Sequence, residues 1–437
     1  MNEIMIEKCI RNPKRYFANN RDKSAWYDYY AGYSSLFVTD VLKYLNLSNG
    51  SVVMDPWNGS GTTTQVVQES GYSAVGFDIN PVMVIVAKSR SLDCEASGNV
   101  MSLCNEIIDN SQVADVSFHD SPDPLELWFS TESARAIRNI EWVIHRLLVD
   151  SNHYQPLFKR HLGSVSSLAS FFYVALFRTV KDFLHSFRTT NPTWIKSART
   201  RNEKISIEAS AVFEHFKSHV LSMSVALNRN FRTGSSGSSI IGMASSDDLP
   251  IFDNSVDAVV SSPPYCTRID YVVATLPELA VLGLSDEGYL RQLRNKMIGT
   301  PTICRDVYEI PVSQEWGDTC IHFLDNVKSH RSKASLSYYY KNLTQYFSSL
   351  HRSFVEIDRT LRESGQCILV VQDSYYKDIH LDLAMIVTEM GSLLSWQLLE
   401  RLDFSKNQLY GRRKAYNPGN RLVPKESVLF FRKARGL

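Results

Sequence analysis

The stretch 51–64, SVVMDPWNGSGTTT, constrains the fold of this chain of 437 residues more than any other segment. Its apolar residues 52–54 predict a short strand, and the loop after Asp55 contains Gly59 and Gly61 before a helix that begins near Thr62. Glycines let a backbone approach a ligand closely, and the exposed amides of a helix start favour an anionic or acceptor-rich group. The stretch therefore predicts a nucleotide-like cofactor at the end of a strand.

A second strand and loop repeat this arrangement. Residues 73–77 predict the strand, Asp78 stands at its end, and Asn80-Pro81 opens another helix. An acidic residue in this place accepts hydrogen bonds from ribose hydroxyls, although it is often only a helix cap. Its distance from Asp55 is close to the ~20 residues of a dinucleotide-binding unit. The patterns GxGxxG and GxxxxGKS/T are absent from the sequence, so nicotinamide and P-loop triphosphate binding are not favoured.

A third feature is the tetrapeptide SPPY at 262–265, which follows the apolar run 256–260. Two prolines stiffen the loop and remove backbone donors, and the tyrosine offers a flat face. Open α/β sheets bind their ligands at this carboxyl edge. We interpret the loop as a clamp for a flat ring. The alternative is a plain strand exit, because Pro-Pro also marks ordinary turns.

Together these features resemble a known family. DPWNGSGTT at 55–63, followed by GFDINP at 76–81, resembles the S-adenosylmethionine loop of amino-methylating DNA methyltransferases, whose usual form is DPFxGSGTT. With SPPY added, the chain is similar to N4-cytosine and N6-adenine enzymes. The serine favours N4-cytosine, because the adenine enzymes more often carry Asp or Asn there. The resemblance implies an α/β fold with a Rossmann-like class I methyltransferase sheet, mostly parallel with an antiparallel last strand, and a large helical insertion.

The resemblance also implies two groups of site residues. The catalytic group is Ser262, Pro263, Pro264 and Tyr265. The group expected to bind S-adenosylmethionine is Tyr30, Phe37, Asp55, Pro56, Asn58, Gly59, Ser60, Gly61, Thr62, Thr63, Asp78, Ile79, Asn80, Ser245 and Asp247. Tyr30 and Phe37 belong to YYAGYSSLFVTDVL, which resembles the family's segment over the methionine end of the cofactor.

One departure from the family concerns the cofactor's adenine. Family members usually carry an acidic residue four positions before a Leu-Pro pair, and here Ser245 holds that place before Leu249-Pro250. Asp247 or Asp248 could take over the contact, or the serine hydroxyl could make it. The sequence leaves these alternatives open.

The chemistry follows from the loop. If the Ser262 hydroxyl and the Pro263 carbonyl accept the amino hydrogens of a base, its nitrogen lone pair can point at the methyl group for in-line transfer. The base must be flipped out of the duplex or already single-stranded. C5-cytosine methylation needs a Pro-Cys pair, and Cys266 instead follows Tyr265. The rivals are N6-adenine or RNA methylation, and a DNA-binding module with a vestigial pocket.

About 140 residues separate the second unit from the third predicted strand at 240–243, too many for an ordinary connection. We expect a helical insertion at 93–235, with helices at 136–149 and 165–187, and a catalytic domain at 1–92 and 236–437. The window 154–204 holds nine Lys or Arg against two acids, a net +7, which favours a phosphate-facing surface. The residues expected to contact DNA are Arg188, Trp194, Lys196, Arg199, Arg201, Arg268, Tyr271, Arg412 and Arg413. The alternative is a solvated polar face with a buried Trp194.

The remaining elements complete the expected sheet. We predict a helix at 338–361 ended by Ser364-Gly365, a strand at 366–371, a helix at 380–390, and an antiparallel pair at 396–402 and 427–432. Helical stretches are also expected at 37–45, 276–284 and 289–297. Residues 233–239 read as a flexible tether, and 409–422 as a basic loop.

Composition sets the outer limits. A net charge of +1 gives no general affinity for polyanions, so a nucleic-acid surface must be local. Seven scattered cysteines, without a CxxC pair or a zinc-binding spacing, predict reduced thiols, no metal and a cytoplasmic protein. Neither a signal peptide nor a membrane span is expected. The expected partners are DNA and a cognate restriction nuclease encoded separately.

Overall fold

The structure is a computed structural model that describes residues 10–14, 22–29, 32–116, 122–157, 162–190, 194–227, 237–266, 270–284, 286–303, 310–405 and 424–434. Within them, one sheet of seven strands has the order β3-β2-β1-β4-β5-β9-β8. The strands are β1 Val52–Asp55, β2 Ser73–Asp78, β3 Ser239–Met243, β4 Val256–Ser261, β5 Leu361–Gln372, β8 Trp396–Ser405 and β9 Lys425–Lys433.

The sheet is mostly parallel. The pairs from β3 to β5 are all parallel, and β9 runs antiparallel to both β5 and β8. The predicted sheet with an antiparallel last strand is therefore confirmed. The strand order reverses between β1 and β4, and such a switch point is where open α/β sheets bind their ligands.

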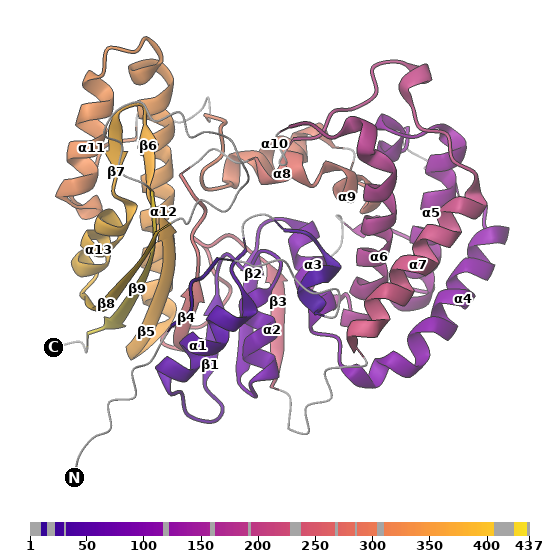
Figure 1. The fold of residues 1–437 in the computed structure, drawn as a ribbon, viewed down its shortest axis with the longest axis horizontal. Coiled ribbons are helices and arrows are strands. Elements are labelled where there is room, and N and C mark those ends of the chain that lie inside the picture. The colour runs from indigo at the N-terminus through magenta and orange to yellow at the C-terminus, as the bar shows by residue number, and fades with distance from the viewer. Residues whose placement is uncertain are drawn as a thin grey trace.

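Helices cover both faces of the sheet (Figure 1). Along β9, Val428 and Phe430 pack with α1 (Ser35–Leu45) and α2 (Thr62–Glu69) on one face. The alternate residues Leu429 and Phe431 pack on the other face, with α12 (Lys341–Thr360) and α13 (Leu383–Leu393). The apolar residues of β9 are buried on both faces, as expected of an interior strand.

Two helix boundaries differ from prediction. The predicted stop at Ser364-Gly365 is wrong: α12 (Lys341–Thr360) ends earlier, and β5 begins at Leu361. The parallel register with β4 shifts between Val256↔Leu361 and Ala258↔Gln366, and Ser364 has φ +61° within this irregular part of β5. The serine and glycine thus mark a bulge in a strand.

The helix predicted at 380–390 starts later. His380 belongs to a small hairpin of β6 (Ser374–Tyr376) and β7 (Ile379–Leu381), and α13 spans Leu383–Leu393. The Asp382 side chain accepts a hydrogen bond from the Met385 amide and so caps the helix. The cap fixes the helix start after the hairpin.

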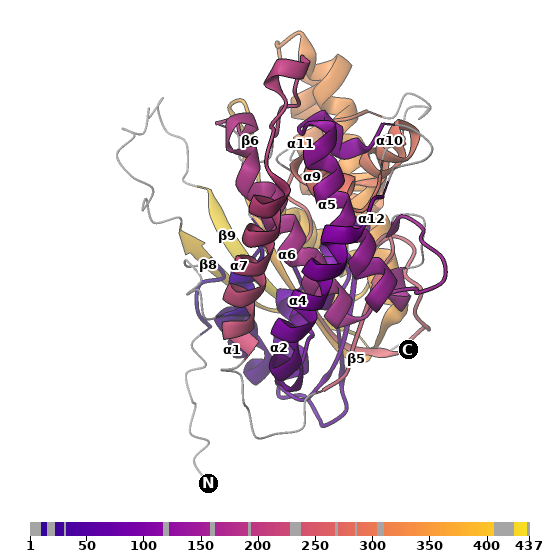
Figure 2. The ribbon, with the colours of Figure 1, turned by 90° about the vertical axis from the view of Figure 1, so that its right-hand side faces the viewer.

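Four long helices occupy most of the stretch predicted as an insertion: α4 (Ser97–Val113), α5 (Thr131–Leu148), α6 (Ser167–Phe183) and α7 (Ala209–Leu227). They lie side by side at one end of the molecule (Figures 1 and 2). Helix α6 also packs on α3 (Pro81–Arg90), so the bundle and α3 share one core. The domain boundaries themselves stay a prediction.

Shorter helices connect these layers. They are η1 Lys23–Trp26, η2 Cys94–Ala96, η3 Pro124–Leu127, η5 Leu162–Ser164, η6 Leu184–Phe187, η7 Arg201–Glu203, α8 Tyr271–Ala274, α9 Leu276–Val281, α10 Glu287–Lys296, η8 Gln314–Trp316, α11 Asp318–Ser329 and the π-helix η9 Ser335–Tyr340. Most of the predicted tether and the whole predicted basic loop lie outside the described residues. Of the helices described, none is both long enough and apolar enough to cross a bilayer.

Candidate active site

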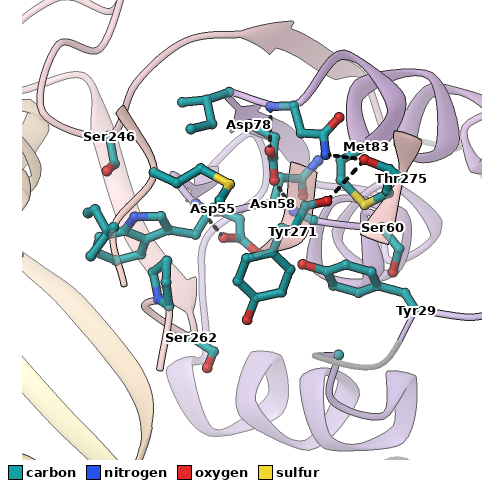
Figure 3. Close-up of a pocket in the computed structure, with 18 of the residues that line it drawn as sticks. Tyr29, Asp55, Asn58, Ser60, Asp78, Met83, Ser246, Ser262, Tyr271 and Thr275 are labelled. Carbon is teal, nitrogen blue, oxygen red and sulfur yellow. Dashed lines mark hydrogen bonds between the residues drawn. The ribbon is translucent and has the colours of Figure 1, made fainter. Parts of the chain in front are cut away.

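The loops after β1, β2, β3 and β4 line one pocket at the carboxyl edge of the sheet. Figure 3 shows Asp55 and Asp78 from the first two loops, Ser246 from the third and Ser262 from the fourth around this pocket. Strands β1 and β4 are neighbours in the sheet. The fold therefore brings the glycine-rich loop and the SPPY loop together, although they are far apart in sequence.

Most of the predicted site residues line this pocket. They are Asp55, Pro56, Asn58, Gly59, Ser60, Thr62, Asp78, Ile79, Asn80, Ser245, Ser262, Pro263, Pro264, Tyr265 and Tyr271. Four others do not line it: Phe37, Gly61, Thr63 and Asp247. Tyr30 lies outside the described residues.

Asp55 joins the two motif loops. Its Oδ1 accepts hydrogen bonds from the Ser261 hydroxyl at 2.5 Å and from the Trp57 amide at 3.1 Å. Its Oδ2 accepts one from the Tyr33 hydroxyl at 3.2 Å. Burial raises the pKa of the Asp55 carboxyl, and these donors lower it in part. Because Ser261 directly precedes the SPPY loop, this contact fixes the two loops relative to each other.

The two loop glycines have separate roles. Gly59 and Gly61 have φ of +47° and +79°, in the left-handed region that favours glycine. A Cβ on Gly59 would lie 2.8 Å from the Tyr29 ring, and one on Gly61 would lie 2.6 Å from the Cβ of Ala87 on α3. Gly59 thus shapes the pocket, while Gly61 lets α2 pack against α3.

Asp78 is held by backbone amides at the end of β2. Its Oδ2 accepts a hydrogen bond from the Gly59 amide at 2.9 Å, and its Oδ1 accepts one from the Asn80 amide at 2.8 Å. Burial raises the pKa of Asp78 to about 6, against the lowering effect of these hydrogen bonds. A half-buried carboxylate that faces the pocket suits the predicted acceptor for ribose hydroxyls.

The SPPY loop is braced from three elements. The Ser262 hydroxyl donates to the Val370 carbonyl of β5 at 2.9 Å, and the Tyr265 hydroxyl donates to Glu426 of β9 at 3.3 Å. The Pro264 carbonyl accepts from the Tyr346 hydroxyl of α12 at 3.0 Å. Because the Ser262 proton is directed at a carbonyl, the oxygen lone pairs remain to accept hydrogen bonds from a ligand.

The aromatic wall of the pocket comes from the segment before α1 and from α8. Tyr29 and Tyr33 line the pocket, and the Tyr29 ring lies 6.4 Å from the Tyr271 ring. Phe37, expected at the cofactor, is fully buried on α1 and packs edge-on against Tyr33. In the segment that resembles the family's stretch over the cofactor, Tyr29 and Tyr33 line the pocket and the predicted Phe37 does not.

Lys181 is a pocket residue that the sequence did not identify. It was counted in the positive window, yet its side chain lines the pocket and its Nζ lies 2.7 Å from Oε1 of the fully buried Glu278. The Tyr27 hydroxyl donates to the same oxygen at 2.6 Å. Lys181, counted in the positive window, therefore lies in the pocket wall and pairs with a buried carboxylate. No motif spacing signals this pair, because its members come from α6 and α9.

The three candidates for the adenine contact differ in their position relative to the pocket. Ser245 lines the pocket, and Asp247 and Asp248 do not. Asp247 accepts a hydrogen bond from the Ser245 hydroxyl and another from Arg352 Nε at 3.1 Å. Asp247 can therefore orient Ser245 from behind.

The predicted DNA-contacting residues fall into three groups. Arg188, Lys196, Arg199 and Arg201 are exposed on the described residues between α6 and α7, as is Trp194 with 49% of its surface accessible. The alternative of a buried anchor tryptophan is therefore wrong. Tyr271 lies in the pocket. Arg268, Arg412 and Arg413 lie outside the described residues.

Two residues of the pocket carry buried donors without a partner among the described residues. Trp57 Nε1 and Asn58 Nδ2 are buried, and neither has a hydrogen-bond partner among the described residues. Buried polar groups without partners are rare in proteins. Both residues line the pocket between the two motif loops.

The sheet topology and this pocket at its switch point define a Rossmann-like class I methyltransferase fold. The chain is similar to Type II methyltransferases. Type II methyltransferase M.BsoBI of Geobacillus stearothermophilus is 27% identical over 303 residues, which are 65% of this chain and 57% of that protein. The match thus spans less than two thirds of that relative's length. No family model matches the chain.

Two further relatives match over most of both chains. Type II methyltransferase M.MvaI of Kocuria varians is 24% identical over 423 residues, 88% of this chain and 85% of that protein. Type II methyltransferase M.AvaI of a Nostoc species is 20% identical over 415 residues, 87% of this chain and 81% of that protein. Type II methyltransferases take the methyl group from S-adenosylmethionine.

Proposed function

We propose that this chain is a site-specific DNA methyltransferase that transfers a methyl group from S-adenosylmethionine to the exocyclic N4 of a flipped cytosine. The observation that carries the proposal is the single pocket shared by the glycine-rich loop, Asp78 and the SPPY loop. The similarity to three Type II methyltransferases supports site-specific DNA methylation within a restriction-modification system.

The pocket residues fit S-adenosylmethionine. Asp78 offers a carboxylate for ribose hydroxyls, and the glycine at 59 lets the Tyr29 ring of the pocket wall lie against the loop. When bound, S-adenosylmethionine supplies an electrophilic methyl group on a sulfonium.

The residues of the SPPY loop prepare the nucleophile. The amino nitrogen of a base is a poor nucleophile, because its lone pair is delocalised into the ring. The Ser262 oxygen, which directs its own proton at Val370, and the Pro263 carbonyl accept the two amino hydrogens. The lone pair then points out of the ring plane. The rigid, braced loop holds this geometry, so catalysis relies on positioning and electrostatics.

Tyr265 and the tyrosines opposite receive the flat ring of the base. Tyr265, Tyr29 and Tyr271 all line the pocket, and aromatic faces are favourable surfaces for a base that has left the stack. Extruding a base from a duplex costs about a few kcal/mol, which stacking in the pocket offsets. The pocket therefore suits a base presented singly.

The choice of N4-cytosine rests on Ser262, since a neutral hydroxyl replaces the acid or amide more usual in adenine enzymes. The rivals are N6-adenine methylation and methylation of an RNA base. Incubation with DNA or RNA and labelled cofactor, followed by nucleoside analysis, distinguishes them. We expect N4-methylcytosine from DNA. N6-methyladenine as the sole product would contradict the cytosine assignment, and a product from RNA alone would contradict the DNA assignment.

A rival of another class is a DNA-binding module with a vestigial pocket. The braced position of Ser262 argues against it, because a pocket that only binds a cofactor has no need of a hydroxyl held in the SPPY loop. Measured methyl transfer with any DNA decides the question. A separately encoded restriction nuclease remains a proposed partner.

We place DNA on the side of the helical bundle that exposes Lys196, Arg199 and Arg201. Replacing all three with alanine should weaken DNA binding and reduce its salt dependence, since each phosphate contact releases counterions. The measurement is DNA affinity at several salt concentrations. Unchanged affinity and slope would remove these residues from the interface.

A further inference from the structure

Asp182, His215 and His219 bring three potential metal ligands together on the helical bundle. Asp182 lies in the last turn of α6, and the two histidines lie one turn apart on α7. Their ligand atoms all lie within 4.8 Å of one another. Asp182 Oδ2 is 2.7 Å from His219 Nε2 and 3.4 Å from His215 Nδ1. None of the three lines the pocket described above.

We propose that these side chains form a Zn²⁺ site that joins α6 to α7. Histidines at positions i and i+4 on one helix lie on the same face and can bind one ion. In a tetrahedral site with ligands at about 2.0–2.1 Å from zinc, neighbouring ligand atoms are about 3.3 Å apart. The separation of 3.4 Å between Asp182 and His215 fits this value. The contact of 2.7 Å to His219 must open by about half an ångström.

Exposure leaves room for a fourth ligand. The side chains of His215 and Asp182 are 45% and 40% exposed, while that of His219 is 13% exposed. Water can therefore complete the coordination from the solvent side. Three protein ligands with one open position are a common arrangement for zinc.

The ligand types select the metal. Two imidazoles and one carboxylate suit zinc and similar transition metals, whereas Mg²⁺ and Ca²⁺ prefer oxygen ligands alone.

The position suggests what the ion would do. The segment 184–208 connects the end of α6 to the start of α7. It carries the exposed residues Arg188, Lys196, Arg199 and Arg201. An ion between the two helices would fix the base of this segment. Without metal, the hydrogen bond between Asp182 and His219 is a weaker link between the same helices.

The test is zinc binding by the full chain without a histidine tag. Calorimetry with Zn²⁺ and metal analysis after dialysis are applied to the wild type, His215→Ala and Asp182→Asn. His215 is exposed, so its alanine variant should fold. Asp182→Asn keeps an oxygen to accept from His219 but loses the anionic ligand. His322→Ala, at an exposed histidine of α11, is the matched control.

We expect the wild type and His322→Ala to bind one more zinc per chain than the two site variants, or to bind it roughly a hundredfold more tightly. The melting temperature should rise with Zn²⁺ only when the site is intact, and Mg²⁺ should leave it unchanged. Because zinc can also bind the cysteines, the difference between variants is the measurement. Equal zinc content and equal melting shifts in wild type and His215→Ala would overturn the proposal.

Discussion

Replacing Ser262 with alanine, beside the same change at its neighbour Ser261, tests the proposed catalytic loop. The two serines are adjacent in sequence but face different partners. Ser262 donates to the Val370 carbonyl at 2.9 Å and lines the pocket. Ser261 is fully buried and donates to the Asp55 carboxylate at 2.5 Å. Both substitutions remove a serine hydroxyl. At Ser262 the hydroxyl has the proposed catalytic role, whereas at Ser261 it stabilises the structure.

The structure gives different magnitudes for the two variants. Ser262→Ala loses one hydrogen bond between neutral groups, which lowers the free energy of unfolding by about 1 kcal/mol. Its transfer rate should fall by about 10²–10³-fold, the effect of removing one preorganised polar group from a reacting centre. Ser261→Ala removes a donor from a buried carboxylate, which should lower the free energy of unfolding by about 1.5–3 kcal/mol. It should also weaken cofactor binding, since Asp55 holds the glycine-rich loop.

Three measurements separate these effects: urea unfolding, calorimetric titration with S-adenosylmethionine, and single-turnover transfer of labelled methyl at saturating cofactor and DNA. Ser262→Ala should keep the cofactor affinity and lose the rate, whereas Ser261→Ala should lose stability and affinity together. A Ser262→Ala rate within about threefold of the wild type, against the ~10²-fold expected, would refute the role given to its hydroxyl.

Two further predictions concern the cofactor side. Gly61→Ala should be less stable than Gly50→Ala in urea unfolding: both have positive φ and a strain of about 1–2 kcal/mol, but only at Gly61 does the new Cβ meet Ala87, at 2.6 Å. Equal losses would show that contact to be harmless. Because burial raises the pKa of Asp78 to about 6, calorimetric cofactor affinity should hold above pH 7 and fall as the carboxylate protonates below about 6. Asp78→Asn should bind weakly at every pH, and a flat wild-type profile would exclude Asp78 as the acceptor.

The sequence predicted the elements around the motifs well, because local chemistry determines them. The apolar residues at 52–54 and 256–260 are short buried runs, which parallel interior strands require. The glycine-rich loop and Asn80 mark helix starts by their own conformations and hydrogen bonds. Sequence reasoning could therefore place both halves of the pocket at strand ends.

Sequence reasoning identified fewer of the pocket residues that come from segments outside the two motif loops. Tyr29 and Tyr33 stand in the segment identified by resemblance, but which tyrosines turn inward depends on packing against Gly59 and on the hydroxyl contact with Asp55. The bulge at Ser364 was similarly hidden, since Ser-Gly ends helices and interrupts strands alike. Such choices are made by tertiary contacts that no local pattern encodes.

The position of Lys181 in the pocket wall also depends on tertiary contacts that no local pattern encodes. Its pair with Glu278 joins the helical bundle to the pocket wall, and Glu278 Oε2 has no hydrogen-bond partner among the described residues. Lys181→Met leaves a buried carboxylate with Tyr27 as a remaining donor. Breaking a fully buried pair costs about 3–5 kcal/mol, and since the Lys181 side chain is 32% exposed we expect a loss of about 2 kcal/mol in urea unfolding. Adding Glu278→Gln should restore much of it, because the neutral amide needs no counter-charge. Strictly additive losses in this double-mutant cycle would mean that the two charges are not coupled.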